Sequence, residues 1–481
     1  MSTTVKTTET PDRRPTMRSI SSTLSDLSSP SYTHLASESI DKRVSLMVER
    51  AKNGEPFTEE EIDDIEKGLQ NLSPIVDNTN SDDNSNDSPQ SIDFAGLRDL
   101  LNKVAHLSHK DWDVTSKNSD LLRETLSIGQ SSSSSSSSND DVNDSNYPLG
   151  SSTRQLLERI LTDGNWDGAV ENARERSQRP PADDNKSWAV LVTGVNGIRK
   201  TTSIYQPWFS KLLSEALVEP IPSLSSSSIA ASSLTEEEGM QQNEDPQTSS
   251  KILCDNLPVG SNTFFRQLDH MICTLCNEEF ARLYAWSDAQ LPKAQQGEEK
   301  DRLVEQYSDY KAAIFSRYRT LSELLGALLL KQAQKVNINC MLETSGRDVA
   351  MFHYVDHFFG ENKNYRKLAL HFTINDLSCA KQSVDRRMVD EIHAGAKAIE
   401  SGSVFDIVYT NQGGPYGSKV LEGVQKDSDQ VWTSQIITGN VAKDWYKATI
   451  AINAHPSEPW TARAVKPDGS LGTKYTFEPR K

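Results

Sequence analysis

The feature that most constrains this chain is an apolar run followed at once by a glycine-containing turn. Residues 188–194 read WAVLVTG, and residues 195–201 read VNGIRKT. A run that is apolar at almost every position is typical of a strand buried on both faces of a parallel sheet. The pattern of residues 201–217 is helical, so this part of the sequence predicts a strand, a tight loop and a helix in succession.

Further segments of the same two kinds follow. Three more strands are predicted, at residues 336–344, 368–374 and 405–410. Helices are predicted around them, at residues 262–285, 300–334 and 382–398, with another beginning at 418–425. Strands that alternate with helices indicate an α/β domain with a largely parallel sheet. We expect this domain to cover residues 151–481.

Residues 1–150 have a different composition, rich in Ser, Asp and Asn, and include an eight-serine run. Such sequence buries too little apolar surface to offset the entropy cost of ordering, so it predicts a mostly disordered tail. Residues 40–72 and 94–107 have helical spacing and are interpreted as marginal helices, partner-binding segments or transient helices in a linker. Residues 221–251, again Ser-rich and acidic, predict a surface insertion within the domain.

Charge and composition exclude several classes of function. The net charge of −17 argues against broad binding of nucleic acid or anionic membranes, because both require clustered Lys and Arg. No apolar run approaches the roughly 20 residues of a membrane span. The N-terminus lacks the apolar core of a secretion signal, so we predict a cytoplasmic protein, with organelle targeting left open. Five cysteines, an odd and sparse set, suit a reducing compartment.

The loop after the first strand has the composition of a phosphate-binding loop. Gly194, Lys200 and Thr201 fit the pattern G-x-x-x-x-G-K-[ST], in which backbone N–H groups surround phosphate oxygens. Lys200 is expected to reach the β- and γ-phosphates, and Thr201 to ligate Mg²⁺. The expected nucleotide-binding residues are Gly194, Val195, Asn196, Gly197, Ile198, Arg199, Lys200, Thr201 and Thr202.

Arg199 is the departure from this pattern, because it stands where the pattern has its second glycine. If that position needs a positive φ, a side chain there costs on the order of 1–2 kcal/mol. Arg199 either adds a phosphate contact or marks a loop that has kept its shape and lost nucleotide binding.

Polar residues that follow the later strands are expected near this loop, because ligands of open α/β sheets bind at the carboxyl ends of strands. Glu343 is a candidate to hold the Mg²⁺ water shell or to orient an attacking hydroxyl; the alternative is a helix cap formed with Thr344 and Ser345. Arg386 and Arg387 suit a lid that closes on transferring phosphates.

Two of these assignments have structural alternatives. Arg386 and Arg387 could instead belong to a solvated helix face, paired with Asp385 and Asp390. Residues 411–417 (NQGGPYG), after the strand predicted at 405–410, either lie near the base or phosphates or form a tight turn that needs glycine.

Taken in order, these features resemble the P-loop kinases of the zeta-toxin-like group, over residues 188–421. The resemblance implies a P-loop three-layer α/β domain, with long helical additions beside it. It implies transfer of the γ-phosphate of ATP to a small acceptor, with Lys200, Thr201, Glu343 and Arg386 or Arg387 matching by order. The carboxylate that would activate the acceptor has no clear counterpart; Asp269 and Asp288 are candidates.

Two other functions stay open. A catalytically degenerate P-loop scaffold would act through protein interactions, with the N-terminal tail recruiting partners. A GTPase is the weaker alternative, because the sequence has no N-K-x-D motif for guanine. The choice between ATP and GTP is therefore left to experiment.

Overall fold

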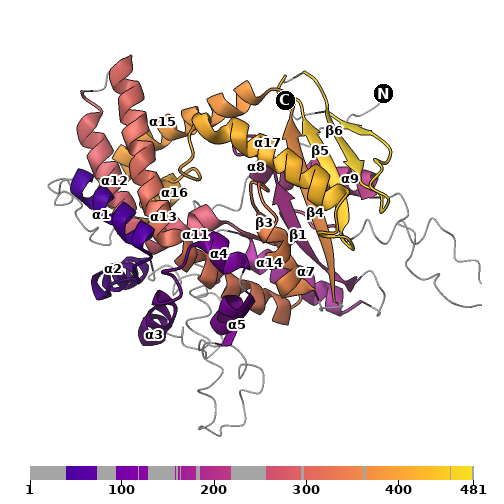
Figure 1. The fold of residues 1–481 in the computed structure, drawn as a ribbon, viewed down its shortest axis with the longest axis horizontal. Coiled ribbons are helices and arrows are strands. Elements are labelled where there is room, and N and C mark those ends of the chain that lie inside the picture. Colours follow the sequence, from indigo (N-terminus) through magenta and orange to yellow (C-terminus); the bar gives the residue numbers. More distant parts are fainter. Residues whose placement is uncertain are drawn as a thin grey trace, which may run out of the picture.

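The computed structural model shows an α/β protein in which helices surround one sheet (Figure 1). Residues 221–251, the predicted insertion, lie outside the part that it describes, as do the eight-serine run and the N-terminal 39 residues. The described residues are 40–72, 94–117, 119–127, 158, 161–162, 164–179, 185–217, 256–293, 297–360, 364–455 and 457–478.

Among the described residues, seven strands form a single mixed sheet in the order β2-β3-β1-β4-β5-β6-β7. The pairings among β2, β3, β1, β4 and β5 are parallel, and those that add β6 and β7 are antiparallel. The strands are β1 (Ser187–Thr193), β2 (Thr263–Arg266), β3 (Asn339–Glu343), β4 (Tyr365–Ile374), β5 (Tyr446–Ile452), β6 (Trp460–Ala464) and β7 (Tyr475–Phe477).

The helices gather mainly to one side of the view, away from the β5–β7 edge of the sheet (Figure 1). Those before the sheet are α1 (Ile40–Asn53), α2 (Glu59–Gln70), α3 (Phe94–Ala105), α4 (Trp112–Lys117), α5 (Ser119–Ser127) and α7 (Trp166–Ser177). Those after β1 are α8 (Lys200–Ile204), α9 (Pro207–Leu217), α11 (Leu268–Leu275), α12 (Asn277–Gln290), α13 (Glu298–Lys335), α14 (Ala350–Phe359), α15 (Leu377–Ser401), α16 (Val404–Thr410) and α17 (Leu421–Val431). A 3₁₀ turn (Ser418–Val420) precedes α17, and a π-helical turn (Trp432–Ile437) follows it.

Strand β1 is the middle one of the five parallel strands and is buried along its whole length, as its apolar run predicts. Trp188 and Val190 belong to an apolar core that includes α9, whereas Ala189 and Leu191 belong to a second core that includes α11 to α14. Alternate residues of a strand point to opposite faces, so the two cores lie on the two sides of the sheet. No helix in the described part of the chain is both long and apolar enough for a membrane crossing.

Two predicted elements are wrong. Residues 405–410 lie in helix α16, not in a strand; its buried residues Val404, Ile407 and Val408 have helical spacing, and Ser403 accepts a hydrogen bond from the Asp406 N–H. A short apolar run fits either element, and here packing selected the helix. The segment 262–285 begins with strand β2, and the strand that extends the sheet beyond β4 is β5, which the sequence pattern had not indicated.

The N-terminal helices are part of the main core, which corrects their interpretation as marginal or transient helices. Met47, Ile65, Leu69 and Leu101 are buried in the same core as α12 and α13. A full capping box formed by Thr58 and Glu61 begins α2. Helical spacing predicted these buried faces, whereas the surface that covers them comes from residues about 200 positions away.

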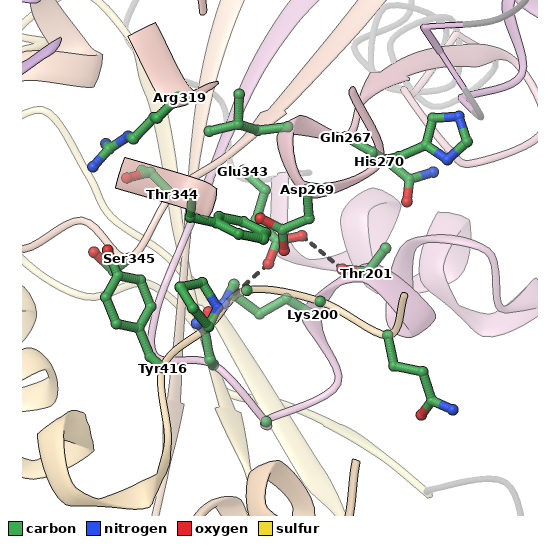
Figure 2. Close-up of a pocket in the computed structure, with 18 of the residues that line it drawn as sticks. Lys200, Thr201, Gln267, Asp269, His270, Arg319, Glu343, Thr344, Ser345 and Tyr416 are labelled. Atoms are coloured by element: carbon green, nitrogen blue, oxygen red, sulfur yellow. Dashed lines mark hydrogen bonds and ion pairs between the residues drawn. The ribbon is translucent and has the colours of Figure 1, made fainter. Parts of the chain in front are cut away.

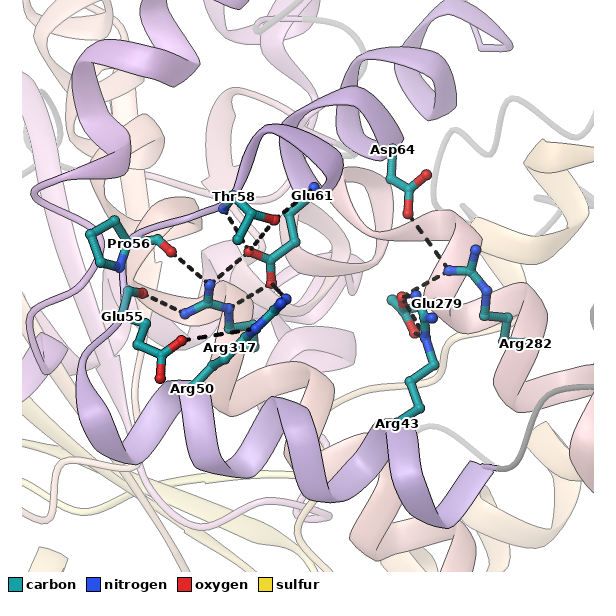
Figure 3. Close-up of polar contacts among 10 residues, drawn as sticks. All are labelled: Arg43, Arg50, Glu55, Pro56, Thr58, Glu61, Asp64, Glu279, Arg282 and Arg317. Atoms are coloured by element: carbon teal, nitrogen blue, oxygen red, sulfur yellow. Dashed lines mark hydrogen bonds and ion pairs between the residues drawn. The ribbon is translucent and has the colours of Figure 1, made fainter.

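Ion pairs fasten the same helices to α12 and α13 (Figure 3). The Arg317 guanidinium, 3% exposed, donates to both Glu61 carboxylate oxygens and to the carbonyls of Glu55 and Pro56. Arg43 on α1 pairs with Glu279 on α12. Burial raises the pKa of Glu61, but the hydrogen bonds from Arg317 and the Thr58 N–H outweigh it, so the pKa is lowered overall. Several of these charges are thus partly buried and paired.

Candidate functional site

The loop between β1 and α8 has an unusual backbone. Gly194 and Gly197 have φ of 128° and 84°, in a region that favours glycine. A Cβ on Gly194 would lie 2.4 Å from the Phe372 carbonyl oxygen, and one on Gly197 would lie 2.6 Å from the Ala380 carbonyl oxygen. Both positions therefore require glycine, for conformation and for space.

Arg199 also has a positive φ, of 64°, and immediately precedes α8. This position is the one where the phosphate-loop pattern has glycine. A residue with a Cβ is strained there by roughly 1–2 kcal/mol. The side chain is exposed and lines the pocket described below, so the strain is not offset by burial of the side chain.

Lys200, Thr201 and Glu343 meet beside this loop (Figure 2). The Lys200 ammonium donates to the carbonyl oxygens of Gly194 and Val195, at 2.7 and 2.8 Å, and lies 3.1 Å from Glu343 Oε1. The Thr201 hydroxyl donates to Glu343 Oε2 at 2.6 Å. Lys200 is only 3% exposed, and its charge is tolerated because three oxygens surround it.

The sheet explains why Glu343 reaches the loop. Strand β3 pairs with β1 in parallel, with Glu343 beside Val192, so the two strands end together. Glu343 does not cap a helix, because α14 begins only at Ala350. The interpretation of Glu343 as a helix cap is therefore wrong, and its carboxylate is directed toward Lys200 and Thr201.

A pocket of about 680 Å³ extends from the loop. Asn196, Gly197 and residues 199–202 form part of its lining, whereas Gly194, Val195 and Ile198 do not line it. Residues of α11, α13 and α15 and the segment 411–416 form much of the rest. Trp112 of α4 also lines it, and packs edge-on against Tyr354 with ring centroids 5.7 Å apart. The N-terminal helices thus contribute directly to the wall of the pocket.

Asp269 is the pocket residue whose acidity is most altered. It lies in the first turn of α11, just beyond the end of β2. Burial raises its pKa to about 6; Lys311, Arg387 and Arg319 oppose the rise, and Glu343 adds to it. Near neutral pH this carboxylate is therefore a base with an unusually high proton affinity.

The second acidic candidate, Asp288, is exposed on α12 and does not line the pocket. Asp269 could have been preferred from the sequence if strand β2 had been recognised, because the residue would then follow a strand end. The short segment TFFR was assigned to a helix instead, and this hid the signal.

The segment 411–414 is held against the pocket by a buried ion pair. Lys311 and Glu391, each 1% exposed, are 2.7 Å apart, and Glu391 also accepts from the Tyr307 hydroxyl at 2.7 Å and from the Gln412 N–H at 2.9 Å. The Asn411 side chain donates to the Asp269 carbonyl at 3.2 Å. The segment follows a helix rather than the predicted strand, yet it does border the pocket.

The two predicted lid arginines both lie on α15, but only one of them lines the pocket. Arg387 lines the pocket and donates to the Gln412 carbonyl at 3.2 Å. Arg386 is exposed and is not among the lining residues. Asp376, at the end of β4, caps α15 through the Ser378 N–H at 2.9 Å and lies outside the pocket. Of Asp376, Arg386 and Arg387, only Arg387 lines the pocket and could contact a ligand there.

No protein-family model, no curated protein and no solved structure matches the chain. Within the described residues, no group of three or more His, Cys, Asp or Glu side chains is arranged to hold a metal ion. What the pocket binds must therefore be argued from its own geometry and chemistry.

Proposed function

We propose that this protein is a P-loop protein that binds ATP and transfers its γ-phosphate to a small hydroxyl-bearing acceptor. The observation that carries the proposal is the meeting of Lys200, Thr201 and Glu343 beside a loop with two obligatory glycines. A backbone loop of this kind offers several N–H groups to phosphate, and the lysine adds a positive charge. The central position of β1 in a parallel set of strands is consistent with a P-loop domain.

Mg²⁺ fits the side chains beside the loop. The Thr201 hydroxyl and the Glu343 carboxylate offer the hard oxygen ligands that this ion prefers, and they lie 2.6 Å apart. They would hold the ion directly or through its water shell. When bound, the ion would neutralise charge on the phosphate oxygens.

The remaining roles follow from position. Lys200 would bind the phosphates, exchanging its contact with Glu343 for phosphate oxygens. Asp269, a half-buried carboxylate in the same pocket, would accept the proton of the acceptor hydroxyl. Arg387 would stabilise the charge that develops during transfer. We assign Asp269 this role in place of Asp288.

A scaffold without catalysis is the second candidate, and Arg199 favours it. The residue places a strained side chain in the loop, where the pattern has glycine. In this case nucleotide binding would be structural or absent, and function would lie in the protein's surfaces. The two proposals differ in whether ATP is consumed.

Calorimetric titration of the full-length protein with ATP and with GTP, each with Mg²⁺, tests both. We expect saturable binding that Lys200→Ala weakens by roughly 10- to 100-fold, because a hydrogen-bonded charge contributes about 1.5–3 kcal/mol. Lys211→Ala is the matched control, since Lys211 is exposed on α9 and pairs only with Glu215 among the contacts described. A folded wild-type protein that binds neither nucleotide would refute the proposal.

A second assay separates enzyme from scaffold. With Mg²⁺ and ATP, the wild-type protein is expected to form ADP slowly even without the acceptor, and Lys200→Ala is expected to lose this activity. Nucleotide binding with no ADP above the level of the Lys200→Ala variant would favour the scaffold. The ratio of ATP to GTP affinity in the same titrations decides which nucleotide is preferred.

A further inference from the structure

Three arginines of the pocket, Arg266, Arg319 and Arg387, have a buried Nε without a hydrogen-bond partner among the described residues. Arg387 already has a proposed role in phosphate transfer, which leaves Arg266 and Arg319. Arg266 lies at the end of β2 and Arg319 lies on α13, and both line the pocket. The Nε atom of each is buried and, within the described part of the chain, has no hydrogen-bond partner. Buried donors are nearly always paired, so unpartnered guanidinium donors in one pocket indicate that a ligand supplies the acceptors.

The charges of these arginines are only partly balanced. Glu323, which is buried, lies 2.6 Å from Arg266 Nη1 and 4.0 Å from Arg319 Nε. One carboxylate therefore serves two guanidinium groups. Arg266 is 2% exposed, and its second close neighbour is the Tyr354 ring, at 5.5 Å. A buried cation that shares its carboxylate with a second cation favours a further anion nearby.

The lining as a whole differs in charge from the rest of the chain. The chain has a net charge of −17, whereas the lining has six Lys or Arg side chains and five acidic ones, Asp113, Asp269, Glu323, Glu343 and Asp348. The basic residues that line it are Arg199, Lys200, Arg266, Arg319, Arg347 and Arg387. Lys200 and Arg199 belong to the phosphate loop, whereas Arg266 and Arg319 come from a strand and a helix beyond it. The pocket thus has two groups of cations that are separate in origin.

We propose that Arg266 and Arg319 form a second anion subsite, which binds a phosphate group already present on the acceptor. This assignment rests on the proposed function, because it names the second substrate of that reaction. A phosphate has enough oxygens to accept from both guanidinium groups at once, and the planar fork of Arg matches them. The acceptor is therefore a phosphorylated hydroxyl compound.

Asp269 connects the subsite to the chemistry. Arg319 and Asp269 line the same pocket, and the positive charge of Arg319 acts to lower the pKa of Asp269. An acceptor anchored through its phosphate would present a hydroxyl to Asp269. In the transfer, the acceptor oxygen forms a bond to the γ-phosphorus and the bond between the γ-phosphorus and the β,γ-bridging oxygen breaks. The hydroxyl proton passes to Asp269, and ADP leaves.

The test uses the full-length protein with Mg²⁺ and a non-hydrolysable ATP analogue, so that the phosphate loop is occupied. Inorganic phosphate, the probe, is then titrated by calorimetry, with acetate as a carboxylate probe. We expect saturable phosphate binding that Arg319→Gln weakens at least about tenfold. Arg319→Lys, which keeps the charge and loses the fork, is expected to bind with intermediate affinity.

Arg302→Gln is the matched control, because Arg302 is exposed on the same helix and lies outside the pocket. It is expected to bind phosphate like the wild-type protein. Normal analogue binding without Arg319-dependent phosphate binding would overturn the subsite and leave the proposed function standing. Tighter binding of acetate than of phosphate would also overturn it. Failure to bind the analogue would instead refute the proposed function, and the acceptor assignment with it.

Discussion

The loop at residues 194–201 and the part of the pocket wall that contains Arg266 and Arg319 are built in different ways. The loop is one continuous segment, and its shape follows from backbone conformation at Gly194 and Gly197. The wall takes Arg266 from β2, Arg319 from α13 and Trp112 from α4, residues that only tertiary packing brings together. A site made of backbone can therefore be recognised in a sequence, whereas a site made of dispersed side chains cannot.

The two regions also differ in what stabilises them. The loop relies on glycine conformations and on the contacts of Lys200. The wall relies on the buried ion pair of Arg266 with Glu323, and the segment 411–414, which lines the same pocket, relies on the buried pair of Lys311 with Glu391. Removal of one partner from a buried pair is severe, because the other charge is left without compensation. The wall should therefore be much more sensitive to single substitutions than the loop.

The largest expected effect on stability comes from Glu391→Ala. It leaves the Lys311 ammonium, the Tyr307 hydroxyl and the Gln412 N–H without their common acceptor. We expect the free energy of unfolding in urea to fall by about 3–5 kcal/mol. The double variant Lys311→Met, Glu391→Leu removes both charges and should lose much less. A double variant as unstable as the single one would show that the ion pair is not what holds this region.

A somewhat smaller effect is expected from Asp269, and it depends on pH. Its pKa is about 6 in the folded protein and near 3.8 when unfolded, so the folded state favours the protonated form. The stability that this provides is complete below pH 4 and is lost as the pH rises through 6. Asp269→Asn should therefore be more stable than wild type at pH 7–8, on the order of 3 kcal/mol, and equal to it near pH 4.

Unfolding in urea at several pH values measures this difference, and Asp288→Asn on the exposed face of α12 is the control, with an expected change below about 0.5 kcal/mol. A pH-independent difference between Asp269→Asn and wild type would contradict the altered acidity. The proposed role predicts in addition that ADP formation increases as the pH rises through about 6 and is lost in Asp269→Asn.

The smallest effect is expected in the loop, at Arg199. Arg199→Gly removes the Cβ that is strained at a φ of 64°, whereas Arg199→Ala keeps it. The glycine variant should be more stable than the alanine variant by about 1 kcal/mol, even though glycine usually destabilises. Thermal or urea unfolding of the pair gives the difference. If alanine is equal or better, Arg199 does not have a left-handed conformation in solution.

Three strands of the sheet could be predicted because each contains an apolar run. Strand β1 is apolar at almost every position, and β3 and β4 contain the shorter runs 340–342 and 368–370; all three lie where the sequence indicated. Strand β2 was missed because four residues are too short for a periodic pattern, and the apolar run of α16 was assigned to a strand because local pattern does not separate the two elements. Because β2 was missed, the sequence did not favour Asp269, which follows β2, over Asp288.

The sequence by itself determined strand β1, the loop after it and the position of Lys200 and Thr201 at the start of α8. Neighbours along the chain need no distant contact to lie together. It also determined the amphipathic faces of the N-terminal helices. Only the tertiary structure decided which surface covers those faces, that Arg387 rather than Arg386 lines the pocket, and that Asp269 and Arg319 line the same pocket. Burial and pairing of charges depend on segments remote in sequence, and no local pattern carries that information.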